Sequence, residues 1–460
     1  MMSWASEELE FADLGDKRRN QRLVKIVEDL AAAPNASIPQ AVRDNAALQG
    51  LYDFWRNPRV EAKEILAAHT LKTIERVREH SLVLAVQDTT EWDFTAHRSK
   101  RGMGSLSNHN AKGLKGHSVL CASPEGVPLG LLHQQVWARA SLRRGKGYRE
   151  RKRAIEDKES GRWLSSLEQT QQLIPGEVGV VTIADREADI YDLFALPRRE
   201  GSEFLIRANH DRCVKSKDGE EVKSLFSSVR EAPVFGQVTL ELQRTPKRKG
   251  RLATLTVRVA TVFLQPPKNR LSSENLQPLK VQGILAVEEN PPIGEKAVCW
   301  LLLTTLSVNS LSEASRCLLW YSYRWLIERF HYVLKSGCHL EELQLSSADR
   351  IQRAVATYGI VAWRLLWLTY SARVNPDFEA EGILSTHEWQ ALYCTIHKTP
   401  SPPESSPTLS ECVRWIAQLG GFLGRKSDGE PGVKTLWRGI QRLNDLAAMW
   451  QMLAKNSRLD

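Results

Sequence analysis

Residues 321 to 335 read Tyr-Ser-Tyr-Arg-Trp-Leu-Ile-Glu-Arg-Phe-His-Tyr-Val-Leu-Lys. At about 100° per residue, this stretch predicts one helix with a polar row along one side. The row consists of Tyr321, Arg324, Glu328 and Lys335. Apolar residues project from the broadly opposite side, so the helix can pack on a core and present the row outward. These apolar residues are Leu319, Leu326, Ile327, Phe330, Val333 and Leu334.

A simpler interpretation of the same helix is an ordinary surface ion pair. Arg324 and Glu328 are four residues apart, and exposed pairs at this spacing contribute only about 0.2 to 0.5 kcal/mol. This helix by itself is consistent both with a surface ion pair and with a phosphate-binding row that contains one carboxylate. The acidic residues elsewhere in the chain help to decide between the two interpretations.

Two aspartates follow apolar segments that read as buried strands. Residues 81–87 lead into Asp88, and residues 178–184 lead into Asp185. In open α/β sheets, ligands gather beyond the carboxyl ends of the strands. Both aspartates are therefore expected at positions where such sheets bind their ligands.

Each aspartate also has a simpler interpretation as a helix cap. Asp is favoured immediately before a helix, and residues 186–194 look helical. The charged run 185–189 would then be a solvated helix start. Together with Glu328, however, Asp88 and Asp185 make three carboxylates from distant segments. Mg²⁺ takes oxygen ligands and needs only a few carboxylates plus substrate phosphate, and such a trio suits two metal ions on a phosphodiester.

At these residues the chain resembles the bacterial cut-and-paste DDE transposases of the insertion-sequence-four type, which include the transposase of composite transposon Tn-five. The family signature is Tyr, two residues, Arg, three residues, Glu, six residues and Lys. The match is complete at Tyr321, Arg324, Glu328 and Lys335. The similarity extends over nearly the whole chain, including segments 14–19, 88–90, 185–189, 300–304 and 419–422.

The resemblance implies roles for individual residues. Three carboxylates would form the catalytic, metal-binding triad, with Mg²⁺ as the cofactor and Mn²⁺ able to replace it: Asp88, Asp185 and Glu328. Three others would hold DNA phosphates at the transposon end: Tyr321, Arg324 and Lys335. Trp300 would hold a flipped base near the cleavage site. A packed aromatic beside an apolar strand remains the alternative for Trp300.

The expected fold class is α/β, with an RNase H-like mixed-sheet catalytic core, a β-rich insertion, and helical N- and C-terminal domains. Residues 1–70 read as a helical DNA-binding domain, and residues 71–370 as the catalytic domain with its insertion at about 200–305. A Pro/Ser-rich linker occupies residues 398–408. By resemblance, residues 371–460 form a helical domain for dimerisation.

Strand-like segments fill the predicted core and insertion. Residues 117–123 and 127–136 are expected to continue the sheet after Asp88. Four further strand-like runs lie before Glu328, at 203–208, 237–243, 252–264 and 298–304.

Basic residues dominate the charge balance, with a net charge of +9 and a pI near 9.1. Such a balance favours a polyanionic partner. Four residues of the helical N-terminal module are expected to contact the transposon end: Lys17, Arg18, Arg19 and Arg22. An ordinary amphipathic bundle is the alternative. The densest basic clusters, 139–153 and 247–251, suit solvated loops as well as DNA-binding surfaces.

Seven cysteines are scattered through the chain without a Cys-x-x-Cys pair. This pattern argues against a zinc module and a disulfide framework, and it favours a reducing compartment. The N-terminus lacks the pattern of a signal sequence, and no apolar run approaches the roughly 18 residues of a membrane helix. We therefore expect a cytoplasmic protein that does not contact a membrane.

The expected function is that of a DNA transposase acting on double-stranded DNA. As a synaptic homodimer, it would bind transposon ends, cleave them by metal-dependent hydrolysis through a hairpin intermediate, and join the 3′ ends to target DNA. One alternative is an RNase H-like metal nuclease without strand transfer. Another is a non-catalytic, transposase-derived DNA-binding regulator, although the presence of all three carboxylates speaks against it.

Overall fold

The computed structural model describes residues 3–139, 159–215, 222–242, 250–267, 276–425 and 428–456. The chain divides into two compact units. Unit 1 comprises Met1–Glu79, Thr89–Ser141 and Leu326–Asp460, and unit 2 comprises His80–Asp88 and Leu142–Trp325. Within the described ranges, the strands form one mixed sheet of twelve. The expected α/β class with helical terminal regions is confirmed.

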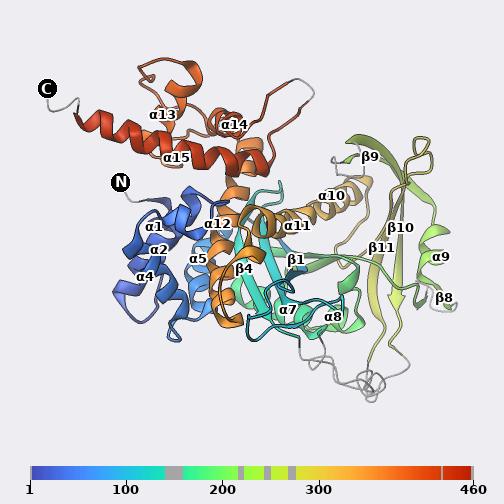
Figure 1. Cartoon of the computed structure of the whole chain (residues 1–460). Helices are drawn as coiled ribbons and strands as arrows, with labels where there is room; N and C mark the ends of the chain where they lie inside the picture. The colour runs from blue at the N-terminus through green and yellow to red at the C-terminus, as the bar shows by residue number, and fades with distance from the viewer. Residues whose placement is uncertain are drawn as a thin grey trace. The chain divides into compact units, whose positions relative to one another are not determined.

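Unit 1 begins with the expected helices, which Figure 1 draws in blue. They are α1 (Trp4–Glu8), α2 (Lys17–Ala32), α3 (Ile38–Val42), α4 (Asn45–Arg56) and α5 (Ala62–Val77). Aspartate caps explain two of the starts. Asp16 accepts a hydrogen bond from the Arg18 N–H of α2, and Asp44 accepts from the Ala46 and Ala47 N–H groups of α4.

The strands of unit 1 are β2 (Gly104–Ser105), β3 (Lys112–Ala122) and β4 (Pro128–Trp137). Strands β3 and β4 are antiparallel, which confirms the two strands expected after Asp88. A glycine on β3 is required by the fully buried indole of Trp92, because a Cβ at Gly116 would lie 2.3 Å from that ring. The close approach therefore depends on the missing side chain.

The helix α12 (Ala348–Val374) is the long buried helix of unit 1 and packs against α5 and β4. Beyond it lie α13 (Thr386–His397), α14 (Leu409–Leu419) and α15 (Val433–Asn456), drawn in red in Figure 1. Helices α14 and α15 approach so closely that a Cβ at Gly439 would lie 1.7 Å from the Ile416 carbonyl oxygen. The helices predicted after the Pro/Ser-rich segment are thus present.

Unit 2 contains a sheet that begins parallel and becomes antiparallel. Strand β1 (Leu82–Asp93), whose first half belongs to this unit, pairs in parallel with β5 (Gly179–Ala184), and β5 pairs in parallel with β6 (Ser202–Arg207). The order continues through the antiparallel strands β12 (Cys299–Thr304), β11 (Leu279–Val287) and β10 (Arg251–Leu264). Strands β7 (Cys213–Lys215) and β9 (Val234–Leu242) pair with β10, and β8 (Val222–Ser224) pairs with β7.

The long strands β9, β10 and β11 give unit 2 the expected β-rich insertion (Figure 1). Among the described residues, the helices of unit 2 are α7 (Gly161–Leu173), α8 (Tyr191–Ala195), α9 (Leu225–Arg230) and α10 (Leu311–Ser322). An apolar core cluster joins α7 to the sheet through residues such as Trp163, Phe194 and Phe204. The strand-like runs predicted before Glu328 correspond to β6, β9, β10 and β12, whereas β11 and the short β7 and β8 were not predicted.

Two local expectations about unit 2 were wrong. The strand predicted at 81–87 continues to Asp93, so Asp88 lies inside β1 and not beyond its end. The helix predicted at 186–194 is a 3₁₀ turn, Arg186–Ala188, followed by the short α8. The two pieces are separated because the Asp189 backbone is not helical, at φ −72° and ψ 68°.

None of the helices in the described ranges combines the length and apolar character that membrane crossing requires.

Candidate active site

Asp88 and Asp185 occupy matching positions on neighbouring parallel strands of unit 2. The register pairs Val86 of β1 with Ile183 of β5, and each aspartate lies two residues further along its own strand direction. Residues in register on adjacent strands project to the same face of a sheet, and adjacent strands are about 4.7 to 4.9 Å apart. Strand β5 stops at Ala184 while β1 continues, so the two half-buried aspartates lie at the level where β1 loses this neighbour.

Asp185 also fulfils the alternative role of a cap. Its Oδ1 accepts a hydrogen bond of 2.8 Å from the Glu187 N–H at the start of the 3₁₀ turn. This bond fixes the carboxylate and occupies one of its two oxygens. A cap and a cation ligand are therefore compatible functions of the same side chain.

The polar row predicted on one helix is distributed over several elements, and the single-helix prediction was wrong. Tyr321 lies in α10, Arg324 lies after that helix, and Glu328 lies in α11 (Trp325–Tyr332). Lys335 lies in a π turn, Val333–Gly337. The Arg324 N–H donates to the Tyr321 carbonyl at 3.0 Å, a three-residue spacing that tightens the chain. The Cys338 N–H donates to the Val333 carbonyl at 2.8 Å, a five-residue spacing that widens it.

The exposure of two residues in this region also differs from the expectation. Tyr321 was expected to face outward but is buried, at 3% exposure, whereas Leu319 was expected in the core and is 45% exposed. The remaining five apolar residues of the predicted core face are buried. Helix α10 ends before Arg324 and α11 begins after it, so the two helices do not share one continuous face. The residues of α10 therefore point in other directions than a single helix would give them.

Tyr321 packs against the residue expected to hold a flipped base. The rings of Trp300 and Tyr321 meet edge to face, with centroids 5.2 Å apart. Burial raises the pKa of Tyr321, with Asp185 acting in the same direction, while Arg324 and Arg207 oppose the shift. The phenol therefore stays protonated at neutral pH and can donate a hydrogen bond. Trp300 itself is half-buried.

Arg207 is a residue of this site that the sequence interpretation missed. It is the last residue of β6, and its Nη2 donates to the Cys299 carbonyl at 3.0 Å. Burial lowers the pKa of Arg207, a hydrogen bond and charge interaction with Tyr321 oppose the shift, and Arg186 and Arg324 add to it. Arg207 and Arg324 thus both interact with Tyr321, and Arg186 interacts with Arg207, a set of guanidinium groups suited to phosphate oxygens. The strand-end rule that singled out the aspartates also applies to Arg207.

Glu328 and Lys335 belong to unit 1, and both are half-buried. Behind them, His331 is buried with its Nε2 3.4 Å from the Ser118 hydroxyl of β3. Burial lowers the pKa of His331 to about 3, with a further contribution from Lys335. The imidazole is consequently neutral, and α11 is anchored on the sheet of its own unit.

The structure places two of the three proposed metal ligands, Asp88 and Asp185, at matching positions on adjacent strands. Among the residues it describes, no three His, Cys, Asp or Glu side chains form a group that could hold a metal ion. The pair nevertheless fits a hard cation, because Mg²⁺ is commonly bound by one or two carboxylates together with waters and substrate phosphates. Glu328, from the other unit, stays a predicted third ligand.

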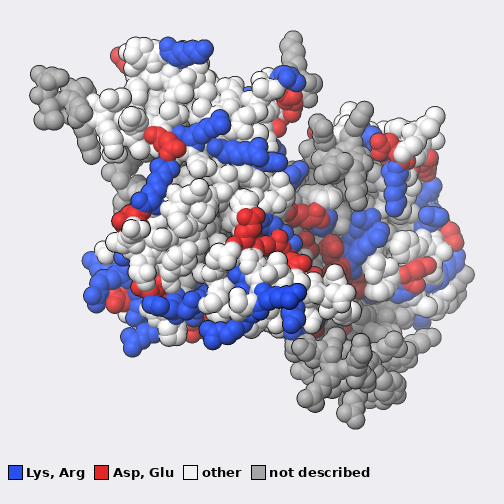
Figure 2. Space-filling view, in the orientation of Figure 1, with Lys and Arg blue, Asp and Glu red and all other residues white. Residues whose placement is uncertain are grey.

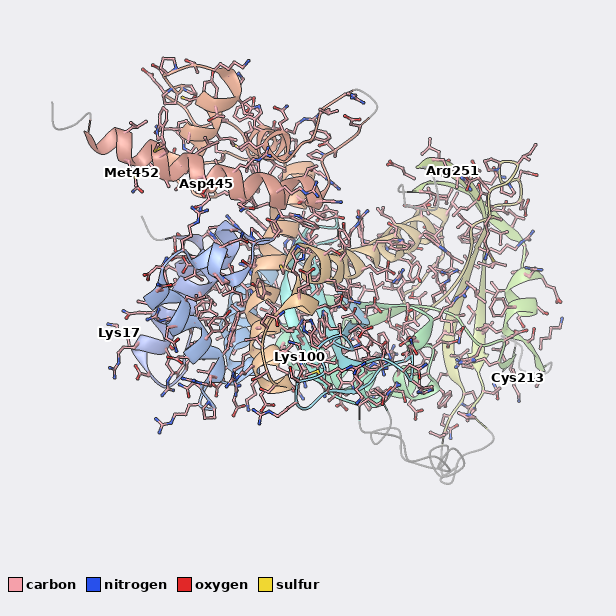
Figure 3. The ribbon with its side chains drawn as sticks, in the orientation of Figure 1. Lys17, Lys100, Cys213, Arg251, Asp445 and Met452 are labelled. Carbon is pink, nitrogen blue, oxygen red and sulfur yellow. The ribbon has the colours of Figure 1, made fainter. Side chains whose placement is uncertain are left out.

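The N-terminal basic residues divide into exposed and structural ones. Lys17 and Arg18 are exposed, and Figure 3 shows Lys17 projecting from the N-terminal helices. Arg19 donates to the Leu14 carbonyl at 2.6 Å. Arg22 lies over Gly50, where an added Cβ would come within 2.6 Å of its Nη1. Figure 2 shows further basic side chains over the same helices.

Most residues of the two dense basic clusters lie outside the described part of the chain. Arg139 is described in the first cluster, and Gly250 and Arg251 in the second. Arg207 and Arg324 are described basic groups that, like Asp185, interact with Tyr321.

Three family models match the chain. The transposase DNA-binding model matches residues 1–60, the transposase DDE domain matches 159–364, and the transposase Tn5 dimerisation domain matches 360–452. The DDE match includes Asp185 and Glu328 and begins after Asp88. DDE domains depend on divalent metal ions, which agrees with the oxygen ligands at the strand ends. With its DNA-binding, RNase H-like catalytic and dimerisation domains, the chain belongs to the Tn5-like DDE transposases.

Proposed function

We propose that this transposase cuts and joins DNA with Asp88, Asp185 and Glu328 as its catalytic carboxylates. The observation that carries the proposal is the matched placement of the two aspartates on β1 and β5. Mg²⁺, or Mn²⁺ in its place, would be held by the three carboxylates and would supply Lewis-acid activation of the nucleophile and charge neutralisation at phosphorus.

The basic and aromatic residues beside Asp185 would orient the DNA strand. Arg207 and Arg324 are suited to bidentate contacts with phosphate oxygens. The Tyr321 hydroxyl, kept protonated by burial, can donate to the same group. Lys335 would contact the phosphate of the cleaved end as a point charge. Such positioning accounts for much of the catalysis of phosphoryl transfer.

The proposed reaction is a series of displacements at phosphorus. Water first attacks the phosphodiester at the transposon end, and the 3′ oxygen leaves as a hydroxyl. This hydroxyl attacks the opposite strand to form a hairpin and releases the flanking DNA. A second water opens the hairpin, and the regenerated 3′ hydroxyl attacks target DNA. We assign Trp300 to the flipped base of the hairpin step, which its contact with Tyr321 supports.

We propose domain limits of 1–70 for end binding, 71–370 for catalysis and 371–460 for dimerisation. Lys17 and Arg18 are the N-terminal residues best exposed for DNA contacts. The protein binds DNA and forms a homodimer through these terminal domains. A cytoplasmic location is supported by the seven cysteines, all of which are free thiols.

The decisive experiment is a cleavage and strand-transfer assay on DNA that contains the transposon ends, with Mg²⁺. Asp185→Ala should abolish cleavage while leaving end binding intact. Glu187→Ala is the matched control, because this exposed acidic neighbour is ion-paired with Arg162 at 2.9 Å. Cleavage by Asp185→Ala at the wild-type rate would refute the triad. Cleavage without joined product would indicate a nuclease that lacks strand transfer.

A further inference from the structure

Asp189 is a buried carboxylate whose bonding partners come from one neighbouring loop. Its Oδ2 accepts the N–H groups of Asn209 at 2.7 Å and His210 at 2.8 Å. Its Oδ1 is ion-paired with Arg212, whose Nη2 also donates to the Asp189 carbonyl oxygen at 3.0 Å. The side chain has no exposed surface. The run 185–189 is thus not a solvated helix start, as the sequence allowed.

The two segments joined by Asp189 each carry a residue of the candidate site. The loop that it holds begins immediately after Arg207, the last residue of β6. On the other side, Asp185 and Asp189 flank one 3₁₀ turn. That turn is closed by hydrogen bonds from the Ala188 N–H to the Asp185 carbonyl at 3.2 Å and from the Asp189 N–H to the Arg186 carbonyl at 3.3 Å. A short, hydrogen-bonded path therefore connects the Asp185 carboxylate to the Arg207 backbone.

We propose that Asp189 is a positioning residue, which fixes the position of Arg207 with respect to the Asp185 carboxylate. The inference rests on the proposed function, in which Arg207 orients a DNA phosphate and Asp185 binds the metal ion. Arg212 is held a second time, since its guanidinium lies 5.6 Å from the ring centroid of Phe194, a residue of the apolar core. Asp189 does not contact substrate in this scheme. It acts through the loop 208–212.

The test uses Asp189→Asn in the full-length protein. The amide keeps the size of the side chain and an oxygen for the backbone N–H groups, but it removes the charge that Arg212 requires. We expect single-turnover cleavage of prebound end DNA to slow by about 10- to 100-fold, the cost typical of misplaced catalytic groups. End binding should stay close to wild type, and the protein should remain folded at the assay temperature although its melting temperature falls, because Arg212 loses a buried partner. Asp211→Asn is the control, because that exposed carboxylate of the same loop bonds to the Phe226 N–H of α9.

A double-mutant cycle with Arg207→Ala separates positioning from general stability. If Asp189 acts through Arg207, the double variant should cleave no more slowly than Arg207→Ala alone. Multiplied defects would overturn the proposal. A wild-type cleavage rate for a folded Asp189→Asn protein would overturn it as well.

Arg212→Met removes the same ion pair from the other side and should reproduce the cleavage defect. If both single variants fail to fold, the pair maintains the core and the positioning role is refuted. Hydrogen exchange gives a readout that does not need activity, since Asp189→Asn should accelerate exchange at the Asn209 and His210 amides. Unchanged exchange would refute the positioning, whereas absent cleavage by the wild-type protein would refute the proposed function.

Discussion

Replacing Tyr321 by Phe tests the site at the hydroxyl of a buried residue. The substitution keeps the ring and its edge-to-face contact with Trp300, and it removes only the hydroxyl that is hydrogen-bonded to Arg207. A hydrogen bond to a charged group contributes about 1.5 to 3 kcal/mol. If this interaction orients Arg207 in the transition state, cleavage should slow by roughly 10- to 150-fold, since about 1.36 kcal/mol corresponds to a factor of ten.

The assay is single-turnover cleavage of end-containing DNA with Mg²⁺, alongside end binding and thermal melting. Tyr323→Phe is the matched control, because Tyr323 lies two residues away, is half-buried and is expected to matter for packing. The Tyr321→Phe defect should not vary between pH 6 and pH 9, since burial raises the pKa of Tyr321 and its ordinary value is already about 10. Wild-type cleavage by Tyr321→Phe, or an equal defect in folded Tyr323→Phe, would refute the reasoning.

Three other predictions concern the remaining parts of the chain. Lys335→Ala should weaken binding of precleaved ends more than binding of uncleaved ends in a gel-shift assay, and equal weakening would contradict its assignment. Met452→Lys or Leu453→Lys should reduce dimer formation measured by sedimentation, because both side chains are more than half exposed on α15 and Figure 3 shows Met452 on its surface; an unchanged dimer would exclude this patch. Burial lowers the pKa of His331 to about 3, so this imidazole stays neutral in the native state. At this histidine the unfolded chain alone takes up a proton below about pH 6.5, which should lower the free energy of unfolding by about 2 kcal/mol between pH 7 and pH 5. Urea unfolding at the two pH values measures the fall, and identical midpoints would contradict it.

The positions of most strands were accessible from sequence because strands follow apolar runs, whereas their order in the sheet was not predicted. The segments that became β1, β3, β4, β5, β6, β9, β10 and β12 are recognisable by themselves, and the acidic residues that follow two of the predicted strands indicated Asp88 and Asp185. Strand β11 is equally apolar in its second half, with Ile284 and Leu285 buried, but it had not been distinguished from the surrounding insertion.

The wrong predictions lie where hydrogen bonds or ion pairs in the folded chain override a rule about local sequence. Helical periodicity assumes a constant rotation per residue, whereas the chain tightens at Arg324 and widens at Cys338. The run 185–189 looks solvated until Arg212, from the loop after β6, neutralises Asp189. Arg207 follows an apolar strand as the two aspartates do, but a positively charged strand end does not indicate a metal ligand. Such partners are set by tertiary packing, which spacing along one segment cannot reveal.

The direction in which the Lys335 side chain points depends on the π turn around it as well as on its spacing from Glu328 in the sequence. In the wide turn, the Cys338 N–H bonds five residues back instead of four. If one residue of that turn were deleted, the chain would return to α-helical winding and the residues beyond the deletion would keep their orientation, because the wide turn holds one residue more than an α-helical turn. A homologue with one residue fewer between its glutamate and the end of this helix would thus still present the following residues on the same side.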